Sequence, residues 1–239
     1  ARIKATYAAK VSLVDKWLGI FLDTLDETGL AKNTAILLTA DHGTNVGDRP
    51  GQPFGKSGPP RANESHVPFL VHVPDGGSGR SDAIVQPQDV FATLAAIGGA
   101  AVPDTLESHD VLKIVQAGAE ERREIALAGA AVGVWRGAEQ VLFSAYDKEW
   151  RIGVAADPAH CQLERLGTQE DVAADHPDVV ERLRAAAVEE IIRRGLDPQL
   201  AEWLRNDGQG EMPKGIRVTD AHSAPPTWRS YFGYNYTGP

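Results

Sequence analysis

The stretch that decides the fold reads Ala35-Ile36-Leu37-Leu38-Thr39-Ala40-Asp41-His42-Gly43. Its apolar half, residues 35–39, is too short for a helix and predicts a buried strand. The Asp-His pair follows the strand directly, and the glycine after it allows the chain to turn sharply away. Ligands bind beyond the carboxyl ends of strands in open α/β sheets, and a carboxylate beside an imidazole suits a divalent metal. The alternative is a strand end at which the aspartate caps a turn and the histidine is merely exposed.

Two amphipathic helices and a second strand accompany this stretch. Apolar residues recur at helical spacing over residues 6–27 and again over residues 88–97, which predicts one long and one short helix. Residues 67–73 are apolar and short enough to form the second strand. Between the two strands, residues 43–65 are rich in glycine, proline and asparagine and lack periodicity. We expect an irregular loop there, of the kind that often carries functional residues.

The pattern of the sequence changes near residue 120. Five short strand-like pieces follow, separated by turn signals: Ile125–Leu127, Val132–Trp135, Gln140–Phe143, Trp150–Val154 and Gln162–Leu166. A helix with a proline in its first turn is predicted over residues 177–194. We therefore divide the chain into part of an α/β core (1–119, with a loose connection over 100–120), a small antiparallel α+β subdomain (120–205) and an irregular tail (206–239).

The composition excludes several classes of protein. The net charge of −9 argues against binding of nucleic acid or of an anionic membrane surface. No apolar run approaches the ~20 residues that span a bilayer, so we expect a soluble protein without a membrane partner. Cys161 is the only cysteine, and no internal disulfide can form. This leaves the compartment open between cytoplasm and periplasm, because many exported proteins lack disulfides.

The irregular loop contains further candidate site residues. Glycines at 55 and 58 flank Lys56 and would let the backbone hold its ammonium group inward, where it could bind a tetrahedral oxyanion such as sulfate or phosphate. His66 precedes the second strand and could donate a hydrogen bond to substrate or to a ligand. The alternatives are a solvated lysine and an ordinary loop histidine.

Two arginines and the cysteine receive plainer interpretations. Arg49 and Arg61 lie in the same loop and could attract an anion, although solvated charges are the default. Cys161 and Arg165 are four residues apart, which partly imitates a Cys-x-Pro/Ala-x-Arg nucleophile motif. Leu163 occupies the place of the proline or alanine, so we interpret Cys161 as a structural free thiol.

Six segments, taken in order, resemble motifs of the C-terminal portion of a sulfatase in the alkaline phosphatase-like superfamily. They are the helical segment 7–30 with SLVD and LDETGL, the segment 33–43 ending in DHG, Phe54-Gly55-Lys56, the segment 64–70 (ESHVPFL), the helix start at 88–94, and the segment 162–171 with the helix that follows it. The resemblance implies an α/β fold, the C-terminal part of an alkaline phosphatase-like sandwich with a mixed sheet between helices, plus a small antiparallel sheet-and-helix subdomain.

The resemblance also assigns roles to residues. It implies that Asp41 and His42 bind one divalent metal and that Lys56 contacts the substrate oxyanion. The family usually holds calcium, with manganese, magnesium or zinc as alternatives. His42 stands where many sulfatases carry asparagine, which favours calcium less because calcium prefers oxygen ligands. His66 replaces the arginine usual before Val-Pro, and we expect it to help bind substrate.

Essential groups of the family are expected outside this chain. The family nucleophile is a cysteine oxidised to formylglycine, and it lies with two further aspartate ligands in an N-terminal half; Cys161 has the wrong place in the order of motifs. We therefore expect part of a metal-dependent sulfatase, inactive alone. The alternatives are a phosphonate monoester or phosphodiester hydrolase, and a non-catalytic module or one chain of a two-chain protein. The expected partners are a small anionic ester and an N-terminal half, second chain or second copy that completes the sheet.

Overall fold

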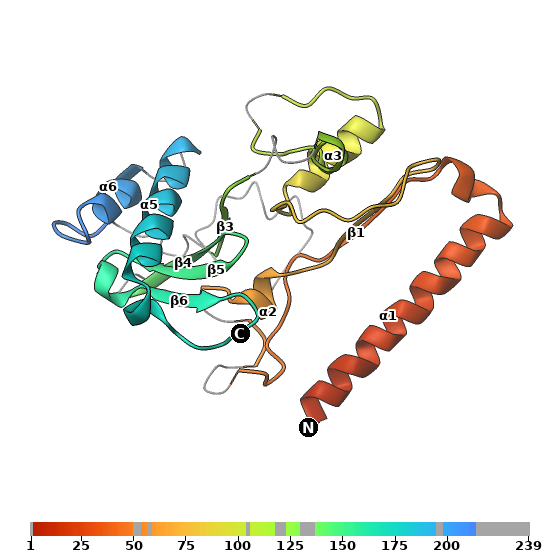
Figure 1. The fold of residues 1–239 in the computed structure, drawn as a ribbon. Coiled ribbons are helices and arrows are strands. Elements are labelled where there is room, and N and C mark those ends of the chain that lie inside the picture. The colour runs from red at the N-terminus through yellow and green to blue at the C-terminus, as the bar shows by residue number, and fades with distance from the viewer. Residues whose placement is uncertain are drawn as a thin grey trace, which may run out of the picture.

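The architecture was taken from a computed structural model with side chains. The structure describes residues 2–49, 54–56, 59–103, 106–117, 123–129, 137–194 and 198–213. Figure 1 shows a long N-terminal helix and a pair of extended strands on one side, and a twisted sheet with two helices on the other. The predicted strand at Val132–Trp135 and the tail after residue 213 lie outside the described residues.

The N-terminal part is a helix followed by a strand pair. Helix α1 (Arg2–Glu27) ends before Gly29, which adopts a left-handed conformation with φ 73°, as expected for a glycine at a helix end. A short 3₁₀ turn, η1 (Leu30–Asn33), leads into strand β1 (Ile36–Thr39). Strand β2 (Phe69–His72) pairs with β1 in antiparallel register. The predicted helix and both predicted strands are therefore confirmed.

The predicted burial of the first strand is wrong. All four residues of β1 are only partly buried, although their apolar run predicted a central strand. The reason is that, among the described residues, β1 pairs with a single neighbour, β2. Helix α1 leaves the same region open, because Leu25 is its only buried residue.

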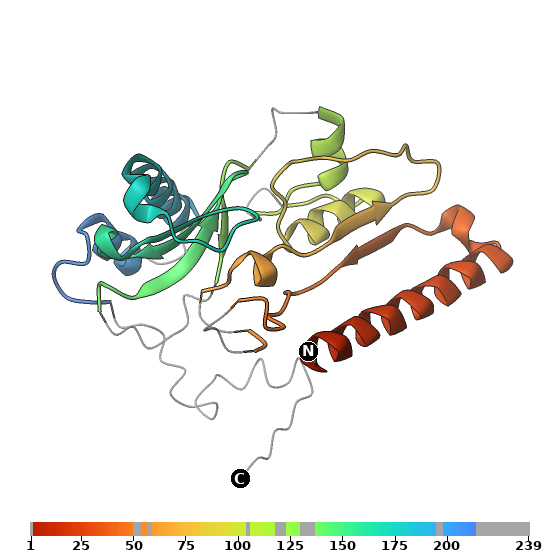
Figure 2. The ribbon, with the colours of Figure 1, turned by 60° about the horizontal axis from the view of Figure 1, so that its bottom comes forward.

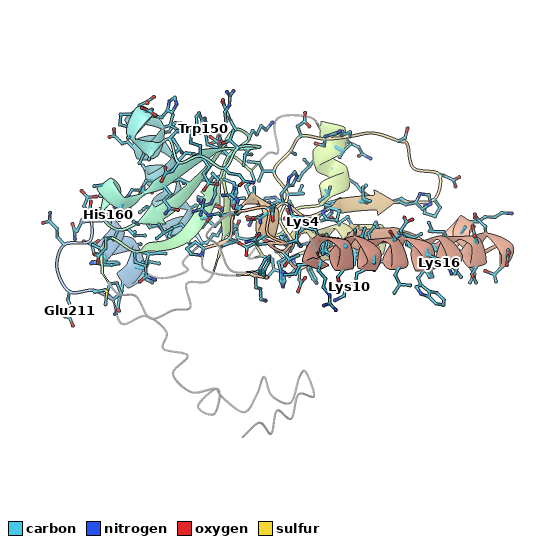
Figure 3. The ribbon with its side chains drawn as sticks, turned by 90° about the horizontal axis from the view of Figure 1, so that it is seen from below. Lys4, Lys10, Lys16, Trp150, His160 and Glu211 are labelled. Atoms are coloured by element: carbon cyan, nitrogen blue, oxygen red, sulfur yellow. The ribbon has the colours of Figure 1, made fainter. Side chains whose placement is uncertain are left out.

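Most of the apolar face of α1 is exposed, up to the buried Leu25 near the end of the helix. Figures 1 and 2 both show this helix standing apart from the C-terminal sheet, and Figure 3 shows its side chains projecting from the helix, with Lys4, Lys10 and Lys16 along it. The large apolar residues that are 39–63% exposed are Ile3, Tyr7, Val11, Leu13, Val14, Trp17, Ile20, Phe21 and Leu22. Contiguous apolar surface of this kind marks an interaction face.

Three further helices of the described residues lie between β1 and the C-terminal sheet. Helix α2 (Ala62–Ser65) is a single turn before β2, and α3 (Asp89–Ile97) confirms the predicted short helix. Helix α4 (Val111–Ala117) corrects the prediction of a loose connection over 100–120. It is a short helix that begins after Asp110, whose carboxylate accepts a hydrogen bond from the backbone N–H of Leu112 at 3.0 Å. An aspartate before a short apolar run was the signal for this helix.

The C-terminal part is a four-stranded antiparallel sheet covered by helices. Its strands lie in chain order: β3 (Ala126–Ala128), β4 (Val141–Tyr146), β5 (Trp150–Ala155) and β6 (Gln162–Arg165). Two 3₁₀ turns, η2 (Pro158–His160) and η3 (Ala173–Asp175), precede the helices α5 (Pro177–Arg193) and α6 (Pro198–Arg205). The helices bury one face of the sheet, and this core includes Ile152, Val154, Leu163, Leu183 and Leu204. Among the described residues no helix is long and apolar enough to cross a bilayer.

Candidate functional site

The structure brings together three of the four predicted site residues just beyond β1. The Nζ atom of Lys56 lies 3.2 Å from Nε2 of His42, and Oδ2 of Asp41 lies 3.5 Å from the same nitrogen. The side chains remain accessible, since Asp41 is 87% and His42 39% exposed. A carboxylate, an imidazole and an ammonium group therefore converge at the strand end.

The hydrogen bonds of His42 define its tautomer. Its Nδ1 lies 2.7 Å from the carbonyl oxygen of Gly43. A carbonyl only accepts hydrogen bonds, so Nδ1 carries the proton. Lys56 only donates, so Nε2 presents a lone pair toward the ammonium group. Histidines that bind metals usually donate their other ring N–H to a carbonyl or carboxylate in this way.

Backbone contacts close the loop around the site. The N–H of Gly43 donates to the carbonyl of Glu64 at 2.8 Å, and Asn45 and Gly55 exchange two backbone hydrogen bonds of 2.8 and 2.9 Å. Gly55 has φ 92°, a conformation that favours glycine. Lys56 follows immediately, so the Asn45–Gly55 pair sets where its side chain starts.

The two loop arginines are not solvated, which corrects their default interpretation. Arg49 is 7% exposed, and its Nη2 donates to Oε2 of Glu164 at 2.9 Å. The side chain of Arg61 is 20% exposed and pairs with the same carboxylate. Burial lowers the pKa of both guanidinium groups. Sequence reasoning missed Glu164, because its two partners in the loop, Arg49 and Arg61, lie more than a hundred residues away in the chain.

Two further residues singled out in the sequence, His66 and Cys161, have other surroundings. His66 caps the C-terminal end of α2 and is exposed; within the described part of the chain, no hydrogen bond joins its side chain to Asp41, His42 or Lys56. Cys161 is 5% exposed, and its Sγ contacts the backbone of Ala155. Burial raises the pKa of this thiol, which agrees with the structural role predicted for it.

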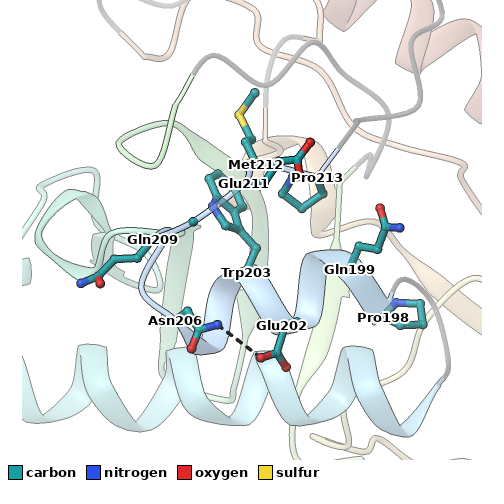
Figure 4. Close-up of a pocket in the computed structure, with 10 residues that line it drawn as sticks. Pro198, Gln199, Glu202, Trp203, Asn206, Gln209, Glu211, Met212 and Pro213 are labelled. Carbon is teal, nitrogen blue, oxygen red and sulfur yellow. Dashed lines mark hydrogen bonds between the residues drawn. The ribbon is translucent and has the colours of Figure 1, made fainter.

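An open hollow of about 580 Å³ lies elsewhere, beside α6 (Figure 4). Trp203, Met212 and Glu202 contribute to its lining, and Asn206 donates to Oε1 of Glu202 at 3.2 Å. None of the predicted site residues lines it. The chemistry of the strand end is therefore separate from this hollow.

Asp41 and His42 fit part of a metal site. The donors are a carboxylate and an imidazole lone pair, which suit a divalent ion. The lone pair on Nε2 of His42 faces the positively charged Nζ of Lys56. No group of three or more histidine, cysteine, aspartate or glutamate side chains able to hold a metal occurs within the described ranges. The pair could supply two ligands, and a metal would need others besides.

The close approach at Gly43 generates a prediction. A Cβ atom at this position would lie 2.2 Å from the carbonyl oxygen of Asn63, so Gly43→Ala must push the loop away. We expect the free energy of unfolding in urea to fall by about 1–3 kcal/mol. Gly77→Ala is the matched control, because a Cβ at Gly77 meets nothing within 4 Å. Equal stability of the two variants would contradict the described loop packing.

Comparison with known proteins identifies the family of the N-terminal part. The sulfatase family model matches residues 1–100. An arylsulfatase of Clostridium perfringens is 28% identical over 120 residues, which cover 48% of this chain and 24% of that protein. A choline-sulfatase of Rhizobium meliloti is 26% identical over 66% of this chain and 32% of its own length. The chain thus spans less than a third of these curated relatives.

The fold is shared with solved structures. A phosphonate monoester hydrolase from Silicibacter pomeroyi superposes with a TM-score of 0.61 over 76% of this chain and 39% of that structure, at 22% identity. At this identity the likeness concerns the fold alone, and it confirms the predicted α/β class. Residues 1–100 of the chain thus match the sulfatase family, and the chain shares its fold with part of a phosphonate monoester hydrolase.

Proposed function

We propose that this chain is part of a metal-dependent sulfatase that hydrolyses sulfate esters. The observation that carries the proposal is the convergence of Lys56 Nζ and Asp41 Oδ2 on Nε2 of His42 at the end of β1. The match of residues 1–100 to the sulfatase family supports it. The substrate is then a small anionic ester.

Each residue of the cluster has a separate role in this proposal. Asp41 and His42 would hold one divalent metal, which when bound supplies positive charge to the ester and to the nucleophile. Calcium is the first choice by family, and manganese, magnesium and zinc are the alternatives. Lys56 contributes the positive charge that offsets charge developing on the oxyanion. His66, whose side chain is exposed, has the secondary role of helping to bind substrate.

The nucleophile is proposed to come from polypeptide outside these 239 residues. Cys161 does not supply it, because the thiol is buried and its pKa is raised by that burial. A thiol in this state carries little thiolate and is poorly accessible. The proposed nucleophile is the formylglycine of the family, on a segment that meets the end of β1.

Separate substitutions of the proposed metal ligand and of the proposed oxyanion-binding residue test this proposal. In a protein that joins this chain to the nucleophile-bearing segment, Asp41→Ala is expected to weaken Mn²⁺ or Ca²⁺ binding at least about tenfold by calorimetry. Lys56→Met should retain the metal and lower kcat for an aryl sulfate about a hundredfold. Asp15→Ala on α1 is the control. Unchanged metal binding and turnover in Asp41→Ala would refute the assignment.

A second chemistry in the same fold is a phosphonate monoester or phosphodiester hydrolase. The observation that favours it is the imidazole of His42, since nitrogen ligands suit zinc or manganese better than calcium. An aryl sulfate and an aryl phosphodiester with the same leaving group separate the two. We expect a higher kcat/KM for the sulfate, and a higher value for the phosphodiester would favour the alternative.

We further propose that another polypeptide covers α1 and the open edge of the β1–β2 pair. Val14 and Trp17 are more than 60% exposed, and a helix in water derives most of its stability from packing its apolar face. The partner is the polypeptide that supplies the rest of the sheet, in the same or a second chain. When that polypeptide is absent, we propose that a second copy of this chain covers α1 and the strand edge.

Association of the isolated chain tests this cover. We expect light scattering to show more than one copy, and Val14→Glu to reduce the association because a charge enters the apolar face. Ser12→Glu adds the same charge nearly opposite on the helix and should leave the association unchanged. A monomer that unfolds cooperatively would contradict the proposal and favour a self-sufficient, non-catalytic module.

A further inference from the structure

Three charged and polar side chains form a row across the C-terminal sheet. Tyr146 on β4 faces Arg151 on β5, which faces Glu164 on β6. Their neighbours Ile152 and Leu163 also pair with each other and belong to the core under α5. Because side chains alternate between the two faces of a strand, the row lies on the face turned away from the helices.

Glu164 is the centre of this row. It is 2% exposed, and its two carboxylate oxygens receive three guanidinium groups. Arg151 donates from within the sheet at 3.3 Å, Arg49 donates from the loop at 2.9 Å, and Arg61 pairs with the same carboxylate. Two of the three partners therefore belong to the loop that carries Lys56.

The carboxylate of Glu164 pairs directly with all three arginines in this buried space, and the buried Glu64 is a second negative charge near Arg49 and Arg61. Burial lowers the pKa of Arg151 to about 10, and the nearby charge of Arg49 adds to burial in lowering the pKa of Arg61. Guanidinium groups keep their charge at neutral pH. Removing the negative charge of Glu164 therefore leaves the three cations without their shared partner, and two of the three, Arg49 and Arg61, belong to the loop.

The same row binds the loop backbone. The Tyr146 hydroxyl donates to the carbonyl of Pro60 at 2.7 Å, and Arg151 Nε lies 3.4 Å from that oxygen. Ser65 Oγ lies 2.6 Å from the Tyr146 hydroxyl. Figures 1 and 2 show the turn α2 beside the sheet in both views. The C-terminal sheet thus holds the loop on both sides of Lys56, at Arg49 and over residues 60–65.

We propose that Glu164 is a positioning residue for the candidate site. It fixes Arg49 and Arg61, and through them the segment that places Lys56 against His42. Its effect on the reaction rests on the proposed function, whereas its hold on the loop does not. If Glu164 only stabilised the C-terminal subdomain, removing its charge would loosen that subdomain. If it positions the loop, removing its charge loosens the loop selectively.

Amide hydrogen exchange of the whole chain separates these roles. In Glu164→Gln we expect the amides of Gly43, Asn45 and Gly55, which are bonded within the loop, to exchange at least about tenfold faster. The amides of β5 should change much less. Glu164→Asp keeps the charge and should restore part of the protection. The proposal would be overturned if exchange of the loop amides did not speed up, or if the amides of β5 sped up by the same factor.

Glu190 is the matched control. It is 8% exposed and accepts hydrogen bonds from Arg193 and Arg194 at the C-terminal end of α5, far along the chain from the loop. Glu190→Gln removes a carboxylate of the same kind and should leave the loop amides protected. Equal loosening of the loop in this variant would count against Glu164 as the specific anchor.

Arg49→Met covers the case in which Glu164→Gln does not fold, since it removes one loop contact and leaves Arg61 and Arg151 on the carboxylate. It should speed exchange of the same loop amides, and unchanged exchange would overturn the proposal. In a protein that turns over an aryl sulfate, Glu164→Gln should lower kcat about tenfold at unchanged metal content. Failure of Asp41→Ala to affect metal binding would refute the proposed function alone, because the exchange experiment needs no metal or substrate.

Discussion

The arrangement of the candidate site depends on the ion pairs between the carboxylate of Glu164 and the arginines of the loop. It is buried on the outer face of the C-terminal sheet and holds arginines from the loop between β1 and β2. A buried charge is costly unless it is paired and hydrogen-bonded, and here the pairing joins distant parts of the chain. The small sheet therefore has a role outside its own subdomain, because it fixes the loop that approaches the end of β1.

The end of β1 gains its chemistry from this attachment. Asp41 and His42 follow the end of β1 closely, and the N–H of Gly43 beside them donates to the carbonyl of Glu64. Lys56 comes from the irregular loop, in which the Asn45–Gly55 pair fixes the residue before it and the two arginines attach the loop to Glu164. The rigid strand supplies the candidate ligands, and the anchored loop supplies the cation.

Local patterns were sufficient for much of this account. The apolar run followed by Asp-His-Gly predicted both β1 and the position of Asp41 and His42, and helical spacing predicted α1, α3 and α5. Lys56 approaches His42 next to Gly55, but its side chain is exposed, so the expectation that it is held inward to bind an oxyanion stays a prediction. The short helix α4 was missed, although Asp110 before an apolar run marked its start.

The failures come from effects that a local pattern does not contain. Apolar residues predicted that β1 is buried, but burial depends on neighbours, and the described residues provide one pairing strand. Arg49 and Arg61 looked like solvated charges because their partner is Glu164, on a strand of the other sheet. His66 resembled a substrate-binding position by motif order, and its place at the end of α2 leaves that role a prediction.

The state of the His42 imidazole tests the central claim most directly. In a protein that joins this chain to the segment with the remaining ligands, nitrogen and proton spectra are assigned with a His42→Gln variant. They report which ring nitrogen carries the proton and which one responds to Zn²⁺, an ion that imidazole binds. The account predicts a proton on Nδ1, donated to Gly43, and a Zn²⁺-dependent shift of Nε2 that disappears in Asp41→Ala. A proton on Nε2, or an imidazole that ignores saturating Zn²⁺, would contradict it.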